Sequence, residues 1–207
     1  HAGVSVGPDG ATHQALEDIA ALRAFPNITI LSPCDANQTY WAAIAAISQL
    51  SSPVYIRFGR AKVPNFTLPD NPFVIGKAQI MHEGNDACII ATGHMVWEAL
   101  QAAYSLEHSG ITCRVVNMST IKPIDKDNII DCAKKFPFII TVEEHQIIGG
   151  LGSAVAETTA AYAPVFVDRI GMRDVFGESG DPIELFEVFN MNTRAIINRV
   201  KKNLYHI

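Results

Sequence analysis

Apolar runs alternate with stretches of helical periodicity along the whole chain, and this alternation predicts an α/β architecture. Continuous β-branched runs favour buried strands, whereas apolar residues three or four positions apart favour one buried face of a helix. In residues 1–60 the pattern predicts helices over 12–23 and 37–49 and strands over 27–31 and 53–58. The side chains expected to form the buried face of the second helix are Trp41, Ile44, Ala45 and Ile47.

The stretch 61–72, AKVPNFTLPDNP, interrupts the alternation with three prolines and no periodicity. Proline lacks the N–H that a helix or a strand ladder requires, so we interpret this stretch as a linker. Beyond it the alternation restarts. Strands are predicted over 73–84, 86–93, 111–118, 136–144 and 164–171, and helices over 95–108, 125–135, 152–162, 182–189 and 193–204. Four or five of these strands fit one mixed or parallel sheet.

The division at the linker separates two unequal parts. Residues 1–60 contain only two clear strands, and a sheet usually needs three or more to be stable by itself. We therefore expect residues 1–60 to be the last portion of a larger α/β domain whose beginning lies outside this chain. Residues 73–207 are expected to form a second α/β domain.

Composition narrows the classes of function. Hydrophobic residues make up 48% of the chain and charged residues 18%, which is typical of a globular protein and excludes broad disorder. The net charge of -5 argues against a nucleic-acid partner, whose surface would need clustered Lys and Arg. The same net charge is compatible with an anionic small-molecule ligand, because one local cationic pocket is enough to bind it. No run approaches about 18 apolar residues, so no membrane partner is expected.

The four cysteines lie far apart and form no CxxC pair. Cys88 and Cys113 are in apolar runs, DACIIATG and ITCRVV, and the other two are Cys34 and Cys132. We expect all four to be free thiols in a reducing, cytoplasmic compartment.

The segment GPDGATHQ is the first candidate for chemistry. Gly7 and Gly10 allow sharp turns on both sides of Asp9, and Thr12 is a good N-cap for the helix predicted to follow. His13 would then lie in the first helical turn. Asp9, His13 and the preceding His1 could converge on one polar ligand. The alternative is a turn with a local Asx bond and two solvated histidines.

The segment IRFGRAKV is the second candidate. It places Arg57, Arg60 and Lys62 at the carboxyl end of a predicted strand, where ligands collect in open α/β sheets. An arginine there can bind a phosphate with two parallel N–H bonds. The alternative is a rim of solvated charge.

Two further motifs favour structural roles. The glycines of IIGGLGSAVAE, residues 147–157, match the dinucleotide-binding fingerprint poorly, because Val155 stands where its third small residue belongs. Close helix packing is the better interpretation. In TVEEH, Glu143 and Glu144 are adjacent on a strand and face opposite sides, so they do not easily share one metal ion with His145. No metal site is predicted.

Taken together, these motifs resemble the transketolase family. The stretch HAGVSVGPDGATHQALEDIAALR is similar to the pattern H-x7-D-G-P-T-H-Q-P-x-E-x-x-A-x-L-R of transketolases, and SPCDANQ supplies the P-x-D that follows it. YIRFGR and TVEEHQIIGGLGSAV extend the resemblance over essentially the whole chain. Ala11 stands where proline is usual, and Pro8 where an acid is common.

The resemblance implies a fold and a cofactor. It implies the tail of a parallel-sheet, thiamin-binding (pyrimidine) domain followed by a C-terminal α/β domain with a mixed five-stranded sheet. The cofactors implied are thiamin diphosphate and Mg²⁺, both bound mainly by parts outside this chain. The chain then resembles the C-terminal subunit of a split transketolase, working with an N-terminal portion or subunit as a homodimer or heterotetramer and inactive by itself.

The resemblance also implies roles for four residues. His1 and Arg60 match residues that bind the phosphate of the sugar substrate, and Asp9 matches the residue that recognises the hydroxyl next to the sugar carbonyl. His13 matches a catalytic histidine beside the thiazolium carbon, where it also contacts the cofactor. The implied reaction transfers a two-carbon ketol unit from a ketose phosphate to an aldose phosphate, both sugar phosphates of the pentose phosphate pathway.

Three alternatives remain open at this point. Deoxyxylulose-phosphate synthases share G-x-D-G-x-T-H-Q, but a glycine generally follows the glutamine there, whereas this chain has Ala15. The β subunits of 2-oxoacid dehydrogenases have a similar C-terminal domain but are not expected to carry the paired-histidine loop. From another class, the chain could be a non-catalytic assembly or regulatory module.

Overall fold

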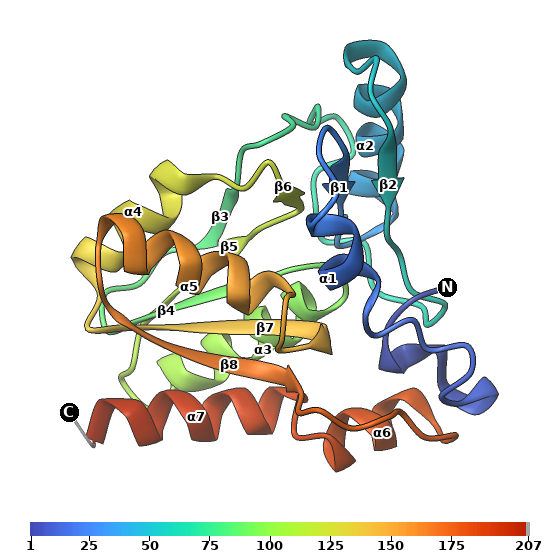
Figure 1. The fold of residues 1–207 in the computed structure, drawn as a ribbon. Coiled ribbons are helices and arrows are strands. Elements are labelled where there is room, and N and C mark those ends of the chain that lie inside the picture. The colour runs from blue at the N-terminus through green and yellow to red at the C-terminus, as the bar shows by residue number, and fades with distance from the viewer. Residues whose placement is uncertain (206–207) are drawn as a thin grey trace.

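The computed structural model of the protein describes residues 1–205, and two β-sheets organise it (Figure 1). A five-stranded sheet has the order β3-β5-β4-β7-β8, and a three-stranded sheet has the order β2-β1-β6. The larger sheet consists of β3 (Gln79–His82), β4 (Ala87–Ala91), β5 (Cys113–Asn117), β7 (Phe138–Gln146) and β8 (Phe166–Met172). Only β3 is antiparallel to its neighbour. The predicted mixed five-stranded sheet is confirmed.

Helices cover both faces of the five-stranded sheet (Figure 1). α3 (Met95–Glu107) and α7 (Thr193–Tyr205) pack on one face, and α4 (Lys126–Lys135) and α5 (Leu151–Tyr162) pack on the other. On the central strand β4, Ile89 belongs to the first core and its neighbour Ile90 to the second, and both are fully buried. This two-sided burial explains why the strand is apolar without alternation.

The three-stranded sheet joins the two parts of the chain. β1 (Thr29–Leu31) and β2 (Val54–Ile56) run parallel, and β6 (Thr120–Lys122), from the second part, pairs antiparallel with β1. The pattern did not predict β6, because three residues are too few to show a period. α2 (Ala36–Gln49) packs on this sheet, with α1 (Asp18–Arg23) near β1.

The proline-containing stretch 61–72 has no helix or strand and is nonetheless held in place. Asp35, the N-cap of α2, accepts hydrogen bonds from the backbone N–H groups of Phe66 and Thr67 at 2.9 and 2.7 Å. Trp41 donates through Nε1 to the carbonyl of Pro69 at 2.6 Å. The stretch is therefore tied along the start of α2. Its status as the boundary between two domains stays a prediction.

The first predicted helix is wrong over its first half. Helix α1 begins only at Asp18, residues 11–13 form a turn, and Thr12 caps no helix. The reason is a competing set of backbone bonds: His13 N–H donates to the Gly10 carbonyl, and Ala15 forms a bridge with Ala2. His13 is consequently a loop residue.

The predicted buried face of α2 is confirmed for Ala45 and, in part, for Trp41, which packs against the same core, but it is wrong for Ile44 and Ile47. Its buried residues include Ala42, Ala45 and Ala46, whereas Ile44 is 43% exposed and Ile47 is 83% exposed. The small alanines let the helix lie close to the sheet, and the bulky side chains are left on the outside. Periodicity located the helix but could not tell its alanine face from its isoleucine face.

The remaining elements follow the prediction to within a few residues, except that the strand predicted over 73–84 is confined to β3, Gln79–His82. α6 (Pro182–Val188) starts at a proline, with Asp181 as its N-cap, and the short 3-10 helix η1 (Val4–Asp9) was not predicted. All four cysteines are free and buried, as expected. Within residues 1–205, no helix combines the length and the apolarity needed to cross a membrane.

Candidate functional site

Residues 1–15, called the N-terminal loop below, form a closed loop with a narrow neck. Gly3 N–H donates to the Ala15 carbonyl at 3.2 Å, and Ala2 pairs with Ala15 in an isolated bridge. η1 and the turn at 11–13 lie between these two ends. The polar side chains of the sequence motif are therefore carried on a single compact loop.

Gly10 shows why the motif needs a glycine. Its φ is +75°, which side-chain-bearing residues rarely adopt, and a Cβ there would overlap the Ser179 hydroxyl. Its carbonyl accepts the His13 N–H at 3.0 Å. The sharp turn thus places Asp9 and His13 on either side of Gly10.

Arg60 lies against this loop. Its Nη1 donates to Oδ2 of Asp9, and the two side chains are 49% and 40% exposed. The neighbouring Gly59 passes the loop neck, where an added Cβ would lie 3.5 Å from the Ala2 carbonyl oxygen. His1 is the sequence neighbour of Ala2, and Arg60 is the sequence neighbour of Gly59. The structure therefore brings the arginine, the aspartate and the beginning of the loop together.

Both histidines of the loop are exposed to solvent. The Thr12 hydroxyl lies 2.9 Å from Nδ1 of His13, which leaves Nε2 as the nitrogen that a ligand would meet. An exposed imidazole can exchange protons near neutral pH. His1 precedes the loop neck, and His13 lies inside the loop, two residues before Ala15.

Arg57 does not share the role considered for Arg60. Its side chain is only 6% exposed, and its Nε donates to Oδ2 of Asp18 at 2.8 Å. Nη2 donates to the carbonyls of Ala15 and Glu144 at 3.0 and 2.8 Å. Burial raises the pKa of Asp18, but the guanidinium and the Tyr55 hydroxyl together hold it below its ordinary value. Arg57 is thus a buried structural ion-pair partner, and the phosphate-binding interpretation is wrong for it.

A groove of about 540 Å³ opens beside Arg60. It lies at the carboxyl ends of β1 and β2, and its lining includes Lys62, His94 and the first turn of α2. Ligands of open α/β sheets collect at such strand ends. Two cations and an imidazole on its walls suit an anionic group.

The TVEEH residues each have a separate structural partner. Glu143 accepts the N–H groups of Leu151 and Gly152 at 2.7 and 2.8 Å, at the start of α5. Complete burial raises its pKa to about 7, although these two bonds act in the opposite direction. Glu144 instead accepts the Ser5 N–H at 2.8 Å.

His145 is buried between Glu143 and Asp18. It donates through Nδ1 to the Gln146 carbonyl at 2.7 Å, and its pKa is lowered by burial and by the positive charge of Arg57. Within residues 1–205 no three histidine, cysteine or acidic side chains are arranged to hold a metal ion. Glu143 thus serves packing within the second part, whereas Glu144 and His145 contact the first part through Ser5 and Ala20.

Two residues that sequence reasoning passed over hold the N-terminal loop. Gln14 donates through Nε2 to the carbonyls of Val4 and Glu178 at 3.1 and 2.9 Å, and Glu144 binds Ser5 as described above. Both lie inside the quoted motifs THQ and TVEEH. Their contacts depend on tertiary neighbours, so no local pattern could have found them.

The fold and the site define an α/β subunit that carries a polar, partly cationic loop site at the ends of two parallel strands. The sequence matches the family descriptions "Transketolase, pyrimidine binding domain" over residues 1–65 and "Transketolase, C-terminal domain" over residues 76–196. The chain belongs to the transketolase family, which is thiamin-diphosphate dependent.

Curated relatives support the same family. The chain is 42% identical to "Putative transketolase C-terminal section" of Methanocaldococcus jannaschii, covering 99% of this chain and 64% of the relative. It is 43% identical to one subunit of an apulose-4-phosphate transketolase of Phocaeicola vulgatus, covering 94% and 62%. It is 37% identical to a "1-deoxy-D-xylulose-5-phosphate synthase" of Caldanaerobacter subterraneus, covering 94% and 32%. The chain thus spans less than two thirds of each of these relatives.

Solved structures give the same result. A "Split gene transketolase, inactive beta4 tetramer" matches with a TM-score of 0.91 and 42% identity, over 99% of this chain and 65% of that one. A Pichia stipitis transketolase in complex with sedoheptulose 7-phosphate matches with a TM-score of 0.75 and 26% identity, over 100% and 29%.

Proposed function

We propose that this chain is the C-terminal portion of a split transketolase that transfers a two-carbon ketol unit from a ketose phosphate to an aldose phosphate. The observation that carries the proposal is the contact of Arg60 with Asp9, next to the loop that bears His1 and His13. The contact joins two of the four residues that match the family motif, and the other two, His1 and His13, belong to the same loop as Asp9. The relatives from Methanocaldococcus and Phocaeicola, both named as portions of a transketolase, support the same assignment.

Arg60 and His1 bind the sugar phosphate in this proposal. A guanidinium presents two parallel N–H donors to a phosphate, and an imidazolium adds a third donor and a second positive charge. Arg60 is half-exposed, so a ligand can reach it without opening the core. Lys62, at the edge of the same groove, adds to the local positive charge.

Asp9 and His13 act at the carbonyl end of the sugar. The Asp9 carboxylate accepts the hydroxyl next to the carbonyl, and its pairing with Arg60 fixes where that oxygen stands. His13 exchanges a proton with the substrate oxygens through Nε2, because its Nδ1 is next to the Thr12 hydroxyl.

Thiamin diphosphate supplies a stabilised carbanion equivalent when it is bound. His1, Asp9, His13 and Arg60 fit the sugar side of such a site, and His13 is exposed to solvent, where a ligand can reach it. A Mg²⁺ ion that bridges a diphosphate to the protein needs oxygen ligands from side chains as well as from the diphosphate, and the described residues hold no cluster of three potential metal ligands. We therefore assign the metal and the diphosphate to parts of the enzyme outside this chain.

An N-terminal transketolase portion or subunit is the partner that completes the site. The split-gene relative is described as an inactive tetramer of one subunit type. By analogy, we propose that this chain is inactive until the N-terminal partner joins it, in a heterotetramer or an equivalent homodimer of complete chains.

A second candidate is a deoxyxylulose-phosphate synthase. Relatives of that name are 36–38% identical to this chain. Ala15, where those enzymes generally have glycine, favours transketolase. The product separates the two, since a deoxy sugar phosphate would indicate the synthase and an ordinary ketose phosphate the transketolase.

The test is to mix the full-length subunit containing this chain with its N-terminal partner, thiamin diphosphate and Mg²⁺, and to assay ketol transfer between sugar phosphates. Activity in the mixture, absent from either subunit alone and abolished by His13→Ala, supports the proposal. A stable complex that forms normally but never turns over any sugar phosphate would instead support a non-catalytic assembly module.

A further inference from the structure

The N-terminal loop rests on the second part of the chain. Figure 1 shows it next to α6 and the ends of β7 and β8. Gln14 binds the Glu178 carbonyl, and an added Cβ at Gly7 would lie 3.2 Å from the Gly180 carbonyl oxygen. The part of the chain that carries no residue of the proposed site therefore supports the loop that carries most of them.

Glu144, near the end of β7, makes the most direct of these contacts. Its side chain is 4% exposed, and its Oε2 accepts the Ser5 N–H at 2.8 Å. Gly3 has a φ of +89°, and a Cβ there would lie 2.9 Å from Cβ of Glu144. The loop approaches this carboxylate so closely that only glycine fits at position 3. The other carboxylate oxygen, Oε1, lies 3.9 Å from Nδ1 of His94.

The backbone of Glu144 holds the other side of the loop through Arg57. One nitrogen, Nη2 of Arg57, donates both to the Glu144 carbonyl and to the Ala15 carbonyl. Glu144 is thus connected to the loop just after its entry, at Ser5, and at its exit, at Ala15. A single residue of the second part fixes both sides of the loop neck.

We propose that Glu144 is a positioning residue for ketol transfer, and that holding the N-terminal loop in its working shape is a role of the second domain. This inference rests on the proposed function. His1 precedes the first anchored position, His13 lies two residues before the second, and Asp9 lies between the two anchors. Movement of the neck would displace all three side chains, whereas Arg60 belongs to the segment that follows β2 and is not part of the loop.

The test compares two variants of Glu144 in the full-length subunit assembled with its partner. Glu144→Gln keeps an oxygen that accepts the Ser5 N–H, and Glu144→Ala removes it. Because misplacing reacting groups by about 1 Å costs up to about 100-fold, we expect Glu144→Ala to lower kcat by about 10- to 100-fold. KM for the ketose phosphate should change less, since Arg60 is not on the loop. Glu144→Gln should retain most of the activity.

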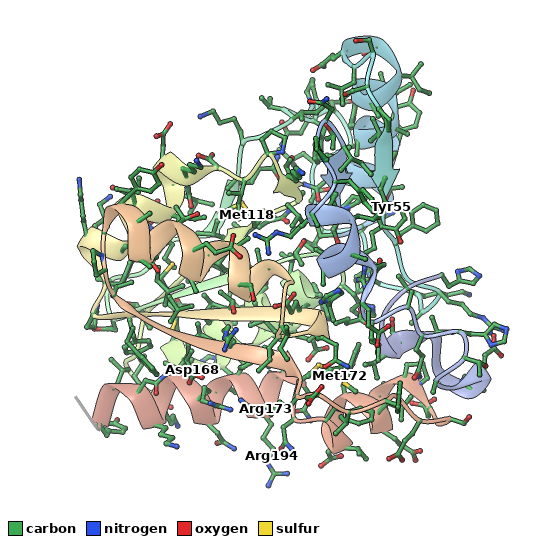
Figure 2. The ribbon with its side chains drawn as sticks, viewed as in Figure 1. Tyr55, Met118, Asp168, Met172, Arg173 and Arg194 are labelled. Carbon is green, nitrogen blue, oxygen red and sulfur yellow. The ribbon has the colours of Figure 1, made fainter. Side chains whose placement is uncertain are left out.

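Asp168 offers a matched control. It is also a buried carboxylate near a strand end of the same sheet, with bonds to Arg199 at 2.8 Å and Asn203 at 2.9 Å. It faces α7, away from the N-terminal loop (Figure 2). Asp168→Ala should lower the unfolding temperature at least as much as Glu144→Ala while leaving kcat unchanged.

Amide hydrogen exchange gives a readout that does not depend on activity. We expect the Ser5 amide and its neighbours to exchange faster in Glu144→Ala and at the normal rate in Glu144→Gln and Asp168→Ala. Unchanged exchange in Glu144→Ala would overturn the inference, and so would an equal loss of kcat in Asp168→Ala. If the wild-type enzyme transferred no ketol unit at all, the proposed function would fail, yet the exchange result would still decide whether Glu144 holds the loop.

Discussion

Arg60 donates a hydrogen bond to Asp9 across 51 positions of sequence. Both side chains are close to half-exposed, so this ion pair adds little to the stability of the fold. Its consequence is spatial. It joins the segment that follows β2 to the outer end of the N-terminal loop, and so holds a guanidinium and a carboxylate together on the loop that also carries His1 and His13.

Replacing Arg57 and replacing Arg60, three positions apart, should lower the unfolding free energy to very different extents. Arg57 is buried and compensates Asp18, so Arg57→Ala leaves a buried carboxylate without its partner and should cost about 3–5 kcal/mol of unfolding free energy. Arg60 is exposed, and Arg60→Ala should cost less than about 1 kcal/mol. Denaturant unfolding of the two variants measures both values. Equal costs would contradict the assignment of Arg57 to the fold and Arg60 to the surface.

His13→Ala should lower kcat for ketol transfer by about 100-fold or more, because proton transfer by a positioned side chain contributes about 10²–10⁴-fold. The ring is exposed and packs in no core, so the unfolding temperature should stay the same. Steady-state kinetics of the assembled enzyme and thermal unfolding check the two statements. His108→Ala is the control: His108 is also an exposed histidine, it lies at the end of α3 outside the N-terminal loop, and the variant should keep the wild-type activity.

Asp9→Ala should discriminate between acceptors. If the carboxylate binds the hydroxyl next to the carbonyl, the variant should lose about 10-fold or more in kcat/KM for hydroxyaldehydes, equivalent to a lost charged hydrogen bond of about 1.5–3 kcal/mol. An aldehyde without that hydroxyl should react at the wild-type rate. The same loss with both acceptors would show that Asp9 acts only by holding Arg60.

Glu143 should make the stability of the protein depend on pH. Its pKa is raised from 4.5 to about 7 in the folded state, so the folded protein holds this proton more tightly than the unfolded one. The resulting stabilisation is fully present below pH 4.5 and is lost as the pH rises through 7; it is on the order of 3 kcal/mol. His145 has the opposite dependence, because its lowered pKa makes the fold lose stability as the pH falls below 6.5.

A comparison with Glu143→Gln isolates the carboxyl group. Its surroundings, which include His145 at 3.8 Å and the charges of Arg57 and Arg169, stay the same in the variant. The difference in unfolding free energy between wild type and variant should therefore shift in favour of the variant between pH 5 and pH 8. Parallel stability curves over that range would show that Glu143 does not titrate there.

The second part of the chain was largely predictable because its strands and helices are long enough to show their periods. The central strand β4 is buried on both faces and reads as one apolar run, and α3 and α5 begin and end close to the predicted residues. The errors occur where tertiary contacts decide the structure. The bridge between Ala2 and Ala15 delays the start of the first helix to Asp18, and β6 forms only because β1 offers it an edge.

The site divides in the same way. The types and spacing of His1, Asp9, His13 and Arg60 were visible in the sequence, and so was the turn around Gly10. What the sequence could not show is which arginine faces the loop, because Arg57 and Arg60 belong to the same short segment. The structure distinguishes the two arginines, because only Arg57 is buried against Asp18. The support of the loop by Glu144 depends on a contact between residues 139 positions apart and has no local signature.

The kinetics of Arg60→Ala with phosphorylated and unphosphorylated donors test the central claim most directly. In the assembled enzyme the variant should raise KM for a ketose phosphate by about 10- to 100-fold, as expected for the loss of a charged phosphate contact. KM for the corresponding ketose without its phosphate should not change. If both donors lost affinity equally, or neither did, Arg60 would not bind the phosphate, and the proposed sugar-phosphate site between the N-terminal loop and β2 would be contradicted.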